Sequence, residues 1–298
     1  MKSLIPTHAS LSRPGLLNLM FLPARANVGV FVYWPLFQGF LISTREWNGY
    51  SPVWDNVGLA KYVRMLGDPV FWMVMVNTLV YGFGSTLLQT LLGLGLALLL
   101  DTPSLRSKVM RTVVYLPAII SPLIMGYIWR FVFQYSGGAL NDIMIALGQE
   151  PQDWLGQGSV AVAIIVLVNS FQYCGVAMII YLAGLQAIPR DCIESAMIDG
   201  AGPVNTFFKV RLPLLMPAIT TSTVINLIGG LQLFDVIVAL TRGGPAQRTS
   251  SISTMVRDVF FIRTDAGYAS AMGIAMFLMI LVITLVSLKA FETKEVAL

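Results

Sequence analysis

The 298-residue sequence contains little charge and almost none of the residues that usually carry metal or redox chemistry. Lys, Arg, Asp and Glu make up 11% of it, less than half of the roughly 25% typical of soluble domains. It has two cysteines, Cys174 and Cys192, and one histidine, His8. Two cysteines are too few for a disulfide framework, and zinc needs several nitrogen or sulfur ligands. We therefore expect no metal, no cofactor bound by this chain and no histidine-based catalysis.

Nucleotide-binding and catalytic signals are also missing. The pattern Gly-x-x-x-x-Gly-Lys-Ser/Thr does not occur, so the chain does not bind nucleotide in that manner. No paired acids and no Ser/His/Asp set fall together in the apolar segments, and an enzyme is not expected. The net charge of +4 comes from basic residues beside apolar runs, which is typical of topology determinants. We expect no nucleic-acid partner.

What the sequence does contain is long uncharged segments. Six of them have lengths of 18 to 36 residues: 26–44, 70–100, 112–129, 154–189, 212–234 and 266–288. A helix needs about 20 apolar residues to cross a bilayer, and barrel strands would instead alternate over ~10 residues. We predict an all-α membrane protein in contact with lipid, a single domain over residues 1–298. The six predicted transmembrane helices are approximately 16–43, 70–100, 110–134, 158–187, 214–240 and 266–290.

The first predicted span allows two interpretations. Lys2, the run LLNLMFLP at 16–23 and Ala24-Arg25-Ala26 loosely resemble a cleavable signal peptide. The apolar run resumes at once, however, and would span the bilayer by itself. We favour an uncleaved first helix, with Arg25 near its cytoplasmic end.

The charges of the loops predict an orientation. Residues 101–111 carry three basic residues and one acid, whereas residues 135–157 carry three acids and no Lys or Arg. By the positive-inside rule the first loop lies in the cytoplasm and the second outside, so with six spans both termini are cytoplasmic. Residues 241–265 carry four arginines on the predicted outer side and disagree with the rule. Both outer loops are candidate docking surfaces for an external protein.

A polar segment, residues 189–213, interrupts the apolar pattern on the predicted cytoplasmic side. Asp191 and Glu194 have the spacing of a capping box for a helix over 190–198, and Gly200 suits the left-handed position that ends it. Pro203 can begin a second helix over about 203–210, which Leu212-Pro213 would stop at the membrane. Helical physics alone leaves two interpretations open, an ordinary surface hairpin or a rigid docking element.

This polar segment resembles the EAA motif of the permease subunits of binding-protein-dependent ABC importers. The family pattern runs Glu-Ala-Ala, three residues, Gly, about nine residues and Ile-x-Leu-Pro, and here Ser195 and Val210 depart from it mildly. The stretches 240–245 and 267–271 are similar to the branch that takes up carbohydrates, of the maltose or glycerol-phosphate type. The resemblance implies an ATPase-coupling role for residues in this segment: Glu194, Ser195, Ala196, Asp199, Gly200 and Ala201.

The resemblance also implies a fold and a set of partners. It implies a type I ABC importer permease fold of six spans in the bacterial plasma (inner) membrane, with a cytoplasmic two-helix coupling segment between spans 4 and 5. The implied partners are a homologous second permease subunit, a cytoplasmic ATP-binding subunit dimer that binds the ATP, an extracytoplasmic solute-binding protein and a sugar. The chain would form the sugar's translocation path.

Polar residues within two predicted spans are candidates for that path. Residues 169, 172 and 173 share one helical face, and similar permeases carry sugar contacts at positions of spans 4 and 5 that match six residues of this chain: Asn169, Gln172, Tyr173, Asn226, Gly230 and Gln232. Amide and aromatic groups suit sugar hydroxyls and ring faces, but the same residues could instead join helices. Asp235 could relay protons or make a helix-end hydrogen bond, and Arg130 could meet Asp142 or an external protein.

Two other functions remain open from the residues alone. An ion-coupled secondary carrier for a small polar solute usually holds buried charges in several spans, and here only Arg25, Arg130 and Asp235 qualify. A membrane-embedded enzyme would need converging catalytic groups, which the spans lack. The identity of the sugar, from monosaccharide to glycan, polyol or glycerol phosphate, is not encoded in these residues.

Overall fold

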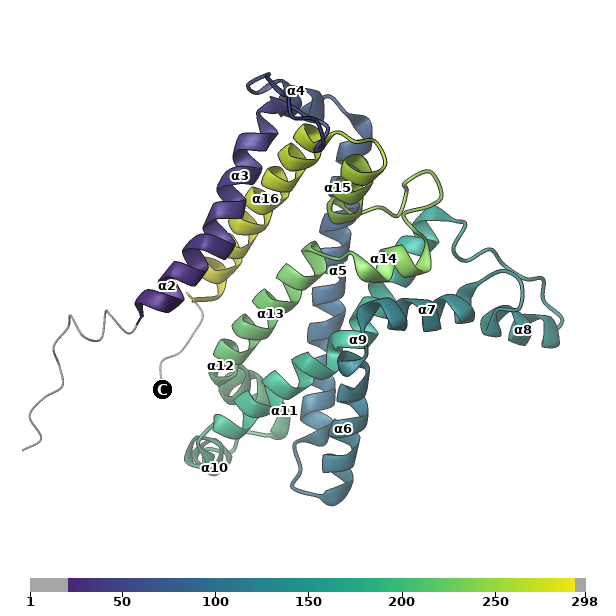
Figure 1. Cartoon of the computed structure of the whole chain (residues 1–298). Coiled ribbons are helices and arrows are strands. Elements are labelled where there is room, and N and C mark those ends of the chain that lie inside the picture. Colours follow the sequence, from purple (N-terminus) through teal and green to yellow (C-terminus); the bar gives the residue numbers. More distant parts are fainter. Residues whose placement is uncertain (1–20, 293–298) are drawn as a thin grey trace, which may run out of the picture.

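A computed structural model describes residues 21–292, and within them the regular secondary structure is helical apart from one short hairpin (Figure 1). The hairpin pairs β1 (Arg45–Glu46) with β2 (Asp55–Asn56) in antiparallel fashion. His8, most of the possible signal peptide and the predicted start of span 1 at residue 16 lie outside the described residues. The first and last residues of the domain predicted over 1–298 also lie outside the described residues.

The described residues contain four helical stretches long and apolar enough to cross a membrane. They are Leu22–Ser43, Pro69–Leu100, Gly158–Ala187 and Ala266–Phe291. Two further stretches qualify only as pairs of helices joined at a sharp bend, which brings the count to six if each pair is one span. The predictions for spans 2, 4 and 6 agree closely with α5 (Pro69–Leu100), α9 (Gly158–Ala187) and α16 (Ala266–Glu292).

Three helices form the centre of the fold: α5, α9 and α13 (Met216–Leu231). Small residues let their backbones approach closely, as expected for helices packed in lipid. A Cβ added at Gly93 of α5 would lie 2.6 Å from the Cβ of Ala177, and one at Gly230 of α13 would lie 2.9 Å from the Cα of Gly82. These positions have no room for a larger side chain.

The first and last spans form a separate layer at one side of the molecule. The first is α2 (Leu22–Val28), one widened π turn (η1, Gly29–Tyr33) and α3 (Trp34–Ser43). Figure 1 shows α3 alongside α16, and the start of α2 close to the end of α16. Most side chains of this first span are exposed, which suits a helix that faces lipid.

Predicted span 3 is not one straight helix. The chain forms α6 (Leu105–Ile119) and α7 (Pro122–Phe133), which meet at 97°. Ile120 and Ser121 are not helical. Ser121 precedes Pro122, and a residue in that position is disfavoured in helical conformation. The break frees the carbonyl of Ile120, and the side chain of Gln172 donates a hydrogen bond to it at 3.0 Å.

Predicted span 5 is interrupted as well. The helix that begins at Pro203 does not stop at Leu212-Pro213. It continues as α11 (Pro203–Thr206), a π turn (η2, Phe207–Arg211) and α12 (Leu212–Leu214), then bends by 64° into α13. Pro213 is tolerated because it lies in the first turn of α12, where a helix does not need its N–H.

The outer part of predicted span 5 departs from the helical path at residues 232–234. Helix α13 ends at Leu231, and α14 (Asp235–Leu240) begins after Phe234, whose φ and ψ are −136° and −61°. Ser251 donates a hydrogen bond to the carbonyl of Leu233 at 2.7 Å, and Ser253 donates one to Gln232 at 3.3 Å. Hydroxyls from a later segment thus satisfy the backbone that the break exposes.

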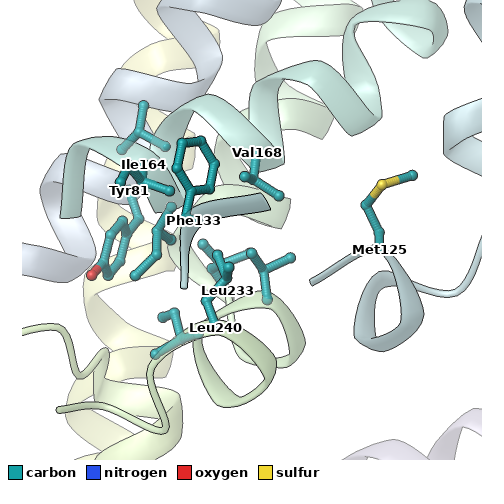
Figure 2. Close-up of a cluster of buried hydrophobic side chains, with 11 residues drawn as sticks. Tyr81, Met125, Phe133, Ile164, Val168, Leu233 and Leu240 are labelled. Atoms are coloured by element: carbon teal, nitrogen blue, oxygen red, sulfur yellow. The ribbon is translucent and has the colours of Figure 1, made fainter. Parts of the chain in front are cut away.

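A hydrophobic cluster fixes α14 and α7 against the central helices. Figure 2 shows side chains of Tyr81, Phe133, Ile164 and Leu240 gathered at one place, supplied by α5, α7, α9 and α14. Tyr81 and Leu240 are almost completely buried. The short helices α7 and α14 therefore belong to the packed interior and are not surface loops.

The two predicted outer loops are ordered by buried polar contacts. In the first, which contains α8 (Ala139–Ala146), the buried Asn141 amide bonds to Tyr135, Gln152 and Trp154 through four contacts of 2.8 to 3.1 Å. In the second, Asn77 and Tyr81 of α5 donate to backbone carbonyls of residues 248–250. This second loop then leads into α15 (Ile252–Phe261) and only in part offers a free surface.

An ion-pair network joins α4 (Ala60–Leu66), β1 and the residue that precedes α16. Lys61 of α4 is buried and contacts Glu46 at 2.7 Å and Asp265 at 3.1 Å, and Arg64 contacts Asp265 at 2.8 Å. Burial alone would raise the pKa of Asp265. Hydrogen bonds from the Tyr268 amide, Lys61 and Arg64 outweigh burial and hold this pKa below its usual value.

The close packing of α9 against α6 is testable with alanine. A Cβ at Gly175 would collide with the Val114 carbonyl and lie 2.9 Å from the Tyr115 Cα, whereas a Cβ at Gly95 meets nothing within 4 Å. Gly175→Ala should destabilise the protein by about 1–3 kcal/mol, because rigid backbone must shift. Thermal unfolding in detergent should give a lower Tm for Gly175→Ala than for Gly95→Ala. Equal Tm values would contradict this packing.

The network at Asp265 predicts a pH dependence of stability. Its folded-state pKa lies below its unfolded value, so its contribution is complete above about pH 4 and disappears as the pH falls through the folded pKa. Asp265→Asn should cost about 1.5–3 kcal/mol at neutral pH, the range for hydrogen bonds to charged groups. The Tm difference from wild type should shrink below about pH 4. Asp55→Asn, on the exposed hairpin, is the control; a difference independent of pH would refute the assignment.

Candidate functional site

A group of uncharged polar side chains lies around a cavity of about 400 Å³. Its walls come from α5, α9, α13, the 232–234 break and the starts of α7 and α14. The cavity therefore lies where the two interrupted spans meet the central helices. The lining residues are Gln89, Pro122, Asn169, Tyr173, Val176, Ile225, Asn226, Gly229, Gly230, Gln232, Leu233, Phe234 and Asp235.

Five of the six residues predicted for a substrate path line this cavity. Asn169 and Asn226 are largely buried, at 2% and 7% exposure, and Tyr173 is half-buried. Asn169 and Tyr173, one helical turn apart on α9, share the face that points into the cavity. Gly230 and Gln232 lie at the end of α13, where the helix stops. Predicted path residues of α9 and of α13 therefore line the same cavity.

Gln172 is the exception. It is fully buried, does not line the cavity, and donates its hydrogen bond to Ile120 at the break between α6 and α7. Residues three positions apart are neighbours on a helix, but here the cavity wall follows positions 169, 173 and 176. Gln172 therefore satisfies a backbone carbonyl and does not line the predicted path.

The sequence did not assign Gln89, Phe234 or Asp235 to this site. The Gln89 amide of α5 donates a hydrogen bond to the Asn169 carbonyl of α9 at 3.2 Å, and Gln89 also lines the cavity. Asp235 was expected to make a helix-end hydrogen bond. It is the first residue of α14, but its side chain caps no helix and is exposed. In the sequence, Asp235 is the first charged residue after the uncharged segment 212–234, and this position was the signal that could have pointed to it.

The chemistry of the cavity is that of a site for a hydroxylated solute. Amides donate and accept hydrogen bonds, a phenol does both, and an aromatic ring offers an apolar face. The Asn169 side-chain amide makes no hydrogen bond within residues 21–292, so its donors and acceptor are free for a ligand. None of the described residues form a cluster that could hold a metal ion.

The six predicted coupling residues lie together at another part of the surface. Helix α10 (Arg190–Ile198) ends in a Schellman motif: the Ala201 amide donates to Ala196 at 2.9 Å and the Gly200 amide to Met197 at 3.1 Å. Gly200 has a φ of +80°, as predicted. Of the six, only Ala196 and Ala201 are partly covered, and the others are exposed: Glu194, Ser195, Asp199 and Gly200.

The predicted capping box of α10 is wrong. Pro189 occupies the N-cap position and no side chain caps the helix, because Asp191 already lies inside the first turn. Glu194 instead borders a recess between α10 and the start of α6, which Lys108, Arg111 and Arg211 also line. The exposed surface includes apolar side chains, notably Ile198 at 85% and Phe208 at 60% exposure. Exposed apolar groups of this kind are typical of contact surfaces.

Arg130 makes no ion pair with Asp142 or with any other acid in residues 21–292. It lies in the last turn of α7 and is partly buried. Nothing in the structure explains its charge.

Comparison with known proteins identifies the family. Residues 89–294 match the family described as "Binding-protein-dependent transport system inner membrane component". The chain is 36% identical over 271 residues to the trehalose/maltose transport system permease protein MalF of Thermococcus litoralis, covering 91% of this chain and 92% of the relative. It is 33% identical to the multiple sugar-binding transport system permease protein MsmF of Streptococcus mutans, covering 90% and 92%.

A solved structure has the same fold. One chain of a bacterial ABC transporter that imports the acidic polysaccharide alginate matches with a TM-score of 0.80 and 25% identity, covering 95% of this chain and 97% of that chain. A further structure of a bacterial alginate transporter, bound to its periplasmic protein, matches with a TM-score of 0.79. The type I importer permease fold expected from the sequence is confirmed. The chain belongs to the family of inner-membrane components of binding-protein-dependent transport systems.

Proposed function

We propose that this chain is the transmembrane permease subunit of an ATP-driven importer for a sugar or sugar derivative. The observation that carries the proposal is the cavity at the two span breaks, with its free Asn169 amide, Tyr173 phenol and Phe234 ring. Relatives named as carriers of trehalose, maltose, lactose and multiple sugars support a carbohydrate. The chain itself would carry out no chemical reaction.

The coupling segment supplies the second half of the proposal. The two short helices joined at Gly200 are held in one geometry by the Schellman motif, and α11, η2 and α12 continue through one bend into α13, which lines the cavity. A cytoplasmic ATPase dimer that contacts Glu194 and its neighbours could therefore move the cavity wall. Rocking of helical bundles around a central site is a general solution for alternating access.

The remaining partners and the topology follow from the same proposal. A homologous second permease would complete the path, and an extracytoplasmic binding protein would deliver the sugar, as the binding-protein-dependent family description suggests. Residues 1–298 would form one domain with both termini in the cytoplasm, and ATP would be bound only by the partner. The comparisons give no support to the alternative, an ion-coupled secondary carrier.

Asn169→Leu tests the cavity. The substitution removes an uncommitted amide, and the loss of one or two hydrogen bonds to sugar should lower uptake about 3- to 30-fold. Leu167→Ala, on the exposed face of the same helix, is the matched control and should transport like wild type. Uptake of radiolabelled maltose, trehalose and lactose by energised vesicles that contain the complete importer is the measurement. Normal uptake by Asn169→Leu would remove this residue from the path.

Glu194→Lys tests the coupling segment. Charge reversal at an exposed contact should abolish uptake and loosen the ATPase, while the protein remains in the membrane because the residue is not buried. The measurements are uptake, transport-stimulated ATP hydrolysis and co-purification of the ATPase in mild detergent. Asp55→Lys, a charge reversal on the exposed hairpin, is the control and should leave uptake and co-purification unchanged. If Glu194→Lys leaves uptake and co-purification unchanged, the coupling role is wrong.

A further inference from the structure

The cavity contains one charged side chain. Of its 13 lining residues, only Asp235 carries charge, and the others are amides, a tyrosine, a phenylalanine, glycines and apolar side chains. Asp235 begins α14 directly after the 232–234 break. The break therefore brings a carboxylate to the wall beside the amides of Asn169, Asn226 and Gln232.

No cation neutralises this carboxylate within residues 21–292. None of the ion pairs there includes Asp235. The nearby Arg257 lies over the Phe234 ring at 5.5 Å, but it donates two hydrogen bonds to Asp258 at 2.6 and 2.9 Å. The charge of Arg257 is therefore paired with Asp258 and not with Asp235.

An unpaired carboxylate has opposite effects on neutral and anionic solutes. It accepts hydrogen bonds from sugar hydroxyls, and such charge-assisted bonds are strong. It repels a second negative charge: at a separation of about 6 Å and an effective dielectric constant of about 20, the repulsion corresponds to roughly a hundredfold in affinity. Because the Asp235 side chain is exposed, solvent and salt screen part of that repulsion.

We infer that this cavity selects neutral sugars and excludes carboxylated, sulfonated and phosphorylated ones, with Asp235 as the residue that sets this charge preference. The inference rests on the proposed function and narrows its substrate class. Relatives with this fold differ in the charge of their named substrates, which include the acidic alginate and sulfoquinovosyl glycerol. A residue that sets charge preference is therefore a position at which such permeases are expected to differ.

The test compares matched probes that differ by one charge. Tritiated maltose, trehalose and lactose are each paired with the derivative in which one primary alcohol is oxidised to a carboxylate. Binding is measured by equilibrium dialysis on the complete permease–ATPase complex in nanodiscs without the binding protein, so that the partner's own selectivity does not contribute. The variants are wild type, Asp235→Asn, Asp235→Glu and, as a matched control far from the cavity, the exposed Asp142→Asn.

The expected pattern is specific. Wild type, Asp235→Glu and Asp142→Asn should prefer a neutral probe over its carboxylate by about tenfold or more, and Asp235→Asn should reduce that preference to about threefold or less. The preference of wild type should also weaken from 20 mM to 500 mM salt. Retained binding of the neutral probe by Asp235→Asn shows that this isosteric variant is folded.

Three results would overturn the inference. Equal or stronger binding of the carboxylates by wild type would refute the charge preference while leaving a sugar permease in place. An unchanged preference in Asp235→Asn would assign the selectivity to another residue. Failure of all six probes to bind wild type would reject the proposed sugar site itself, and the charge preference with it.

Discussion

Backbone carbonyls that a helix break releases must find donors inside the protein, because lipid offers none. Both interrupted spans of this permease depend on that requirement. Gln172 supplies the donor at the break after Ile120, and Ser251 and Ser253 supply donors at residues 232–233. Pro122 and Phe234, which line the cavity, lie directly at these two breaks. The cavity therefore depends on helix breaks whose freed carbonyls the protein itself satisfies.

The same breaks connect the two parts of the molecule that the proposed function needs. Helix α13 runs from the bend at Leu215 to the break at Gln232, so its first residues follow the proposed coupling segment and its last turns line the cavity. Its contact with α5 depends on Gly82 and Gly230, whose backbones lie too close for intervening side chains. Tight packing of this kind transmits displacement well, because packed interiors are weakly compressible.

The uniformly apolar spans could be predicted from the sequence. The broken spans could not, because a proline in an apolar segment can either stay within a helix or begin a new one. Pro117 lies inside α6 without ending it, whereas Pro122 follows two non-helical residues and begins a new helix. Nothing in either proline's immediate neighbours separates the two cases, so span 3 was predicted as continuous. Gln172 was assigned to the cavity for the same reason: its orientation depends on the unforeseen break that it satisfies.

Features that depend only on neighbouring residues could be predicted from the sequence. Gly200 was predicted to take a left-handed conformation because a helix C-terminus demands it within two residues. Asn169 and Tyr173 were correctly placed on one face because an intact helix fixes their relation. The role of Asp235 could not be predicted from the sequence, because it depends on a cavity whose walls come from helices far apart in the chain. No single stretch of the sequence indicates that residues so far apart in the chain line one cavity.

The buried amide of Asn141 gives the 135–157 loop a property that regular secondary structure would not. Four hydrogen bonds from one side chain tie Tyr135, Gln152 and Trp154 into a fixed arrangement. The conformational entropy of this loop is therefore lost when the protein folds and not when another molecule arrives. A protein that binds this loop would therefore contact an ordered surface, and binding would cost little further conformational entropy of the loop.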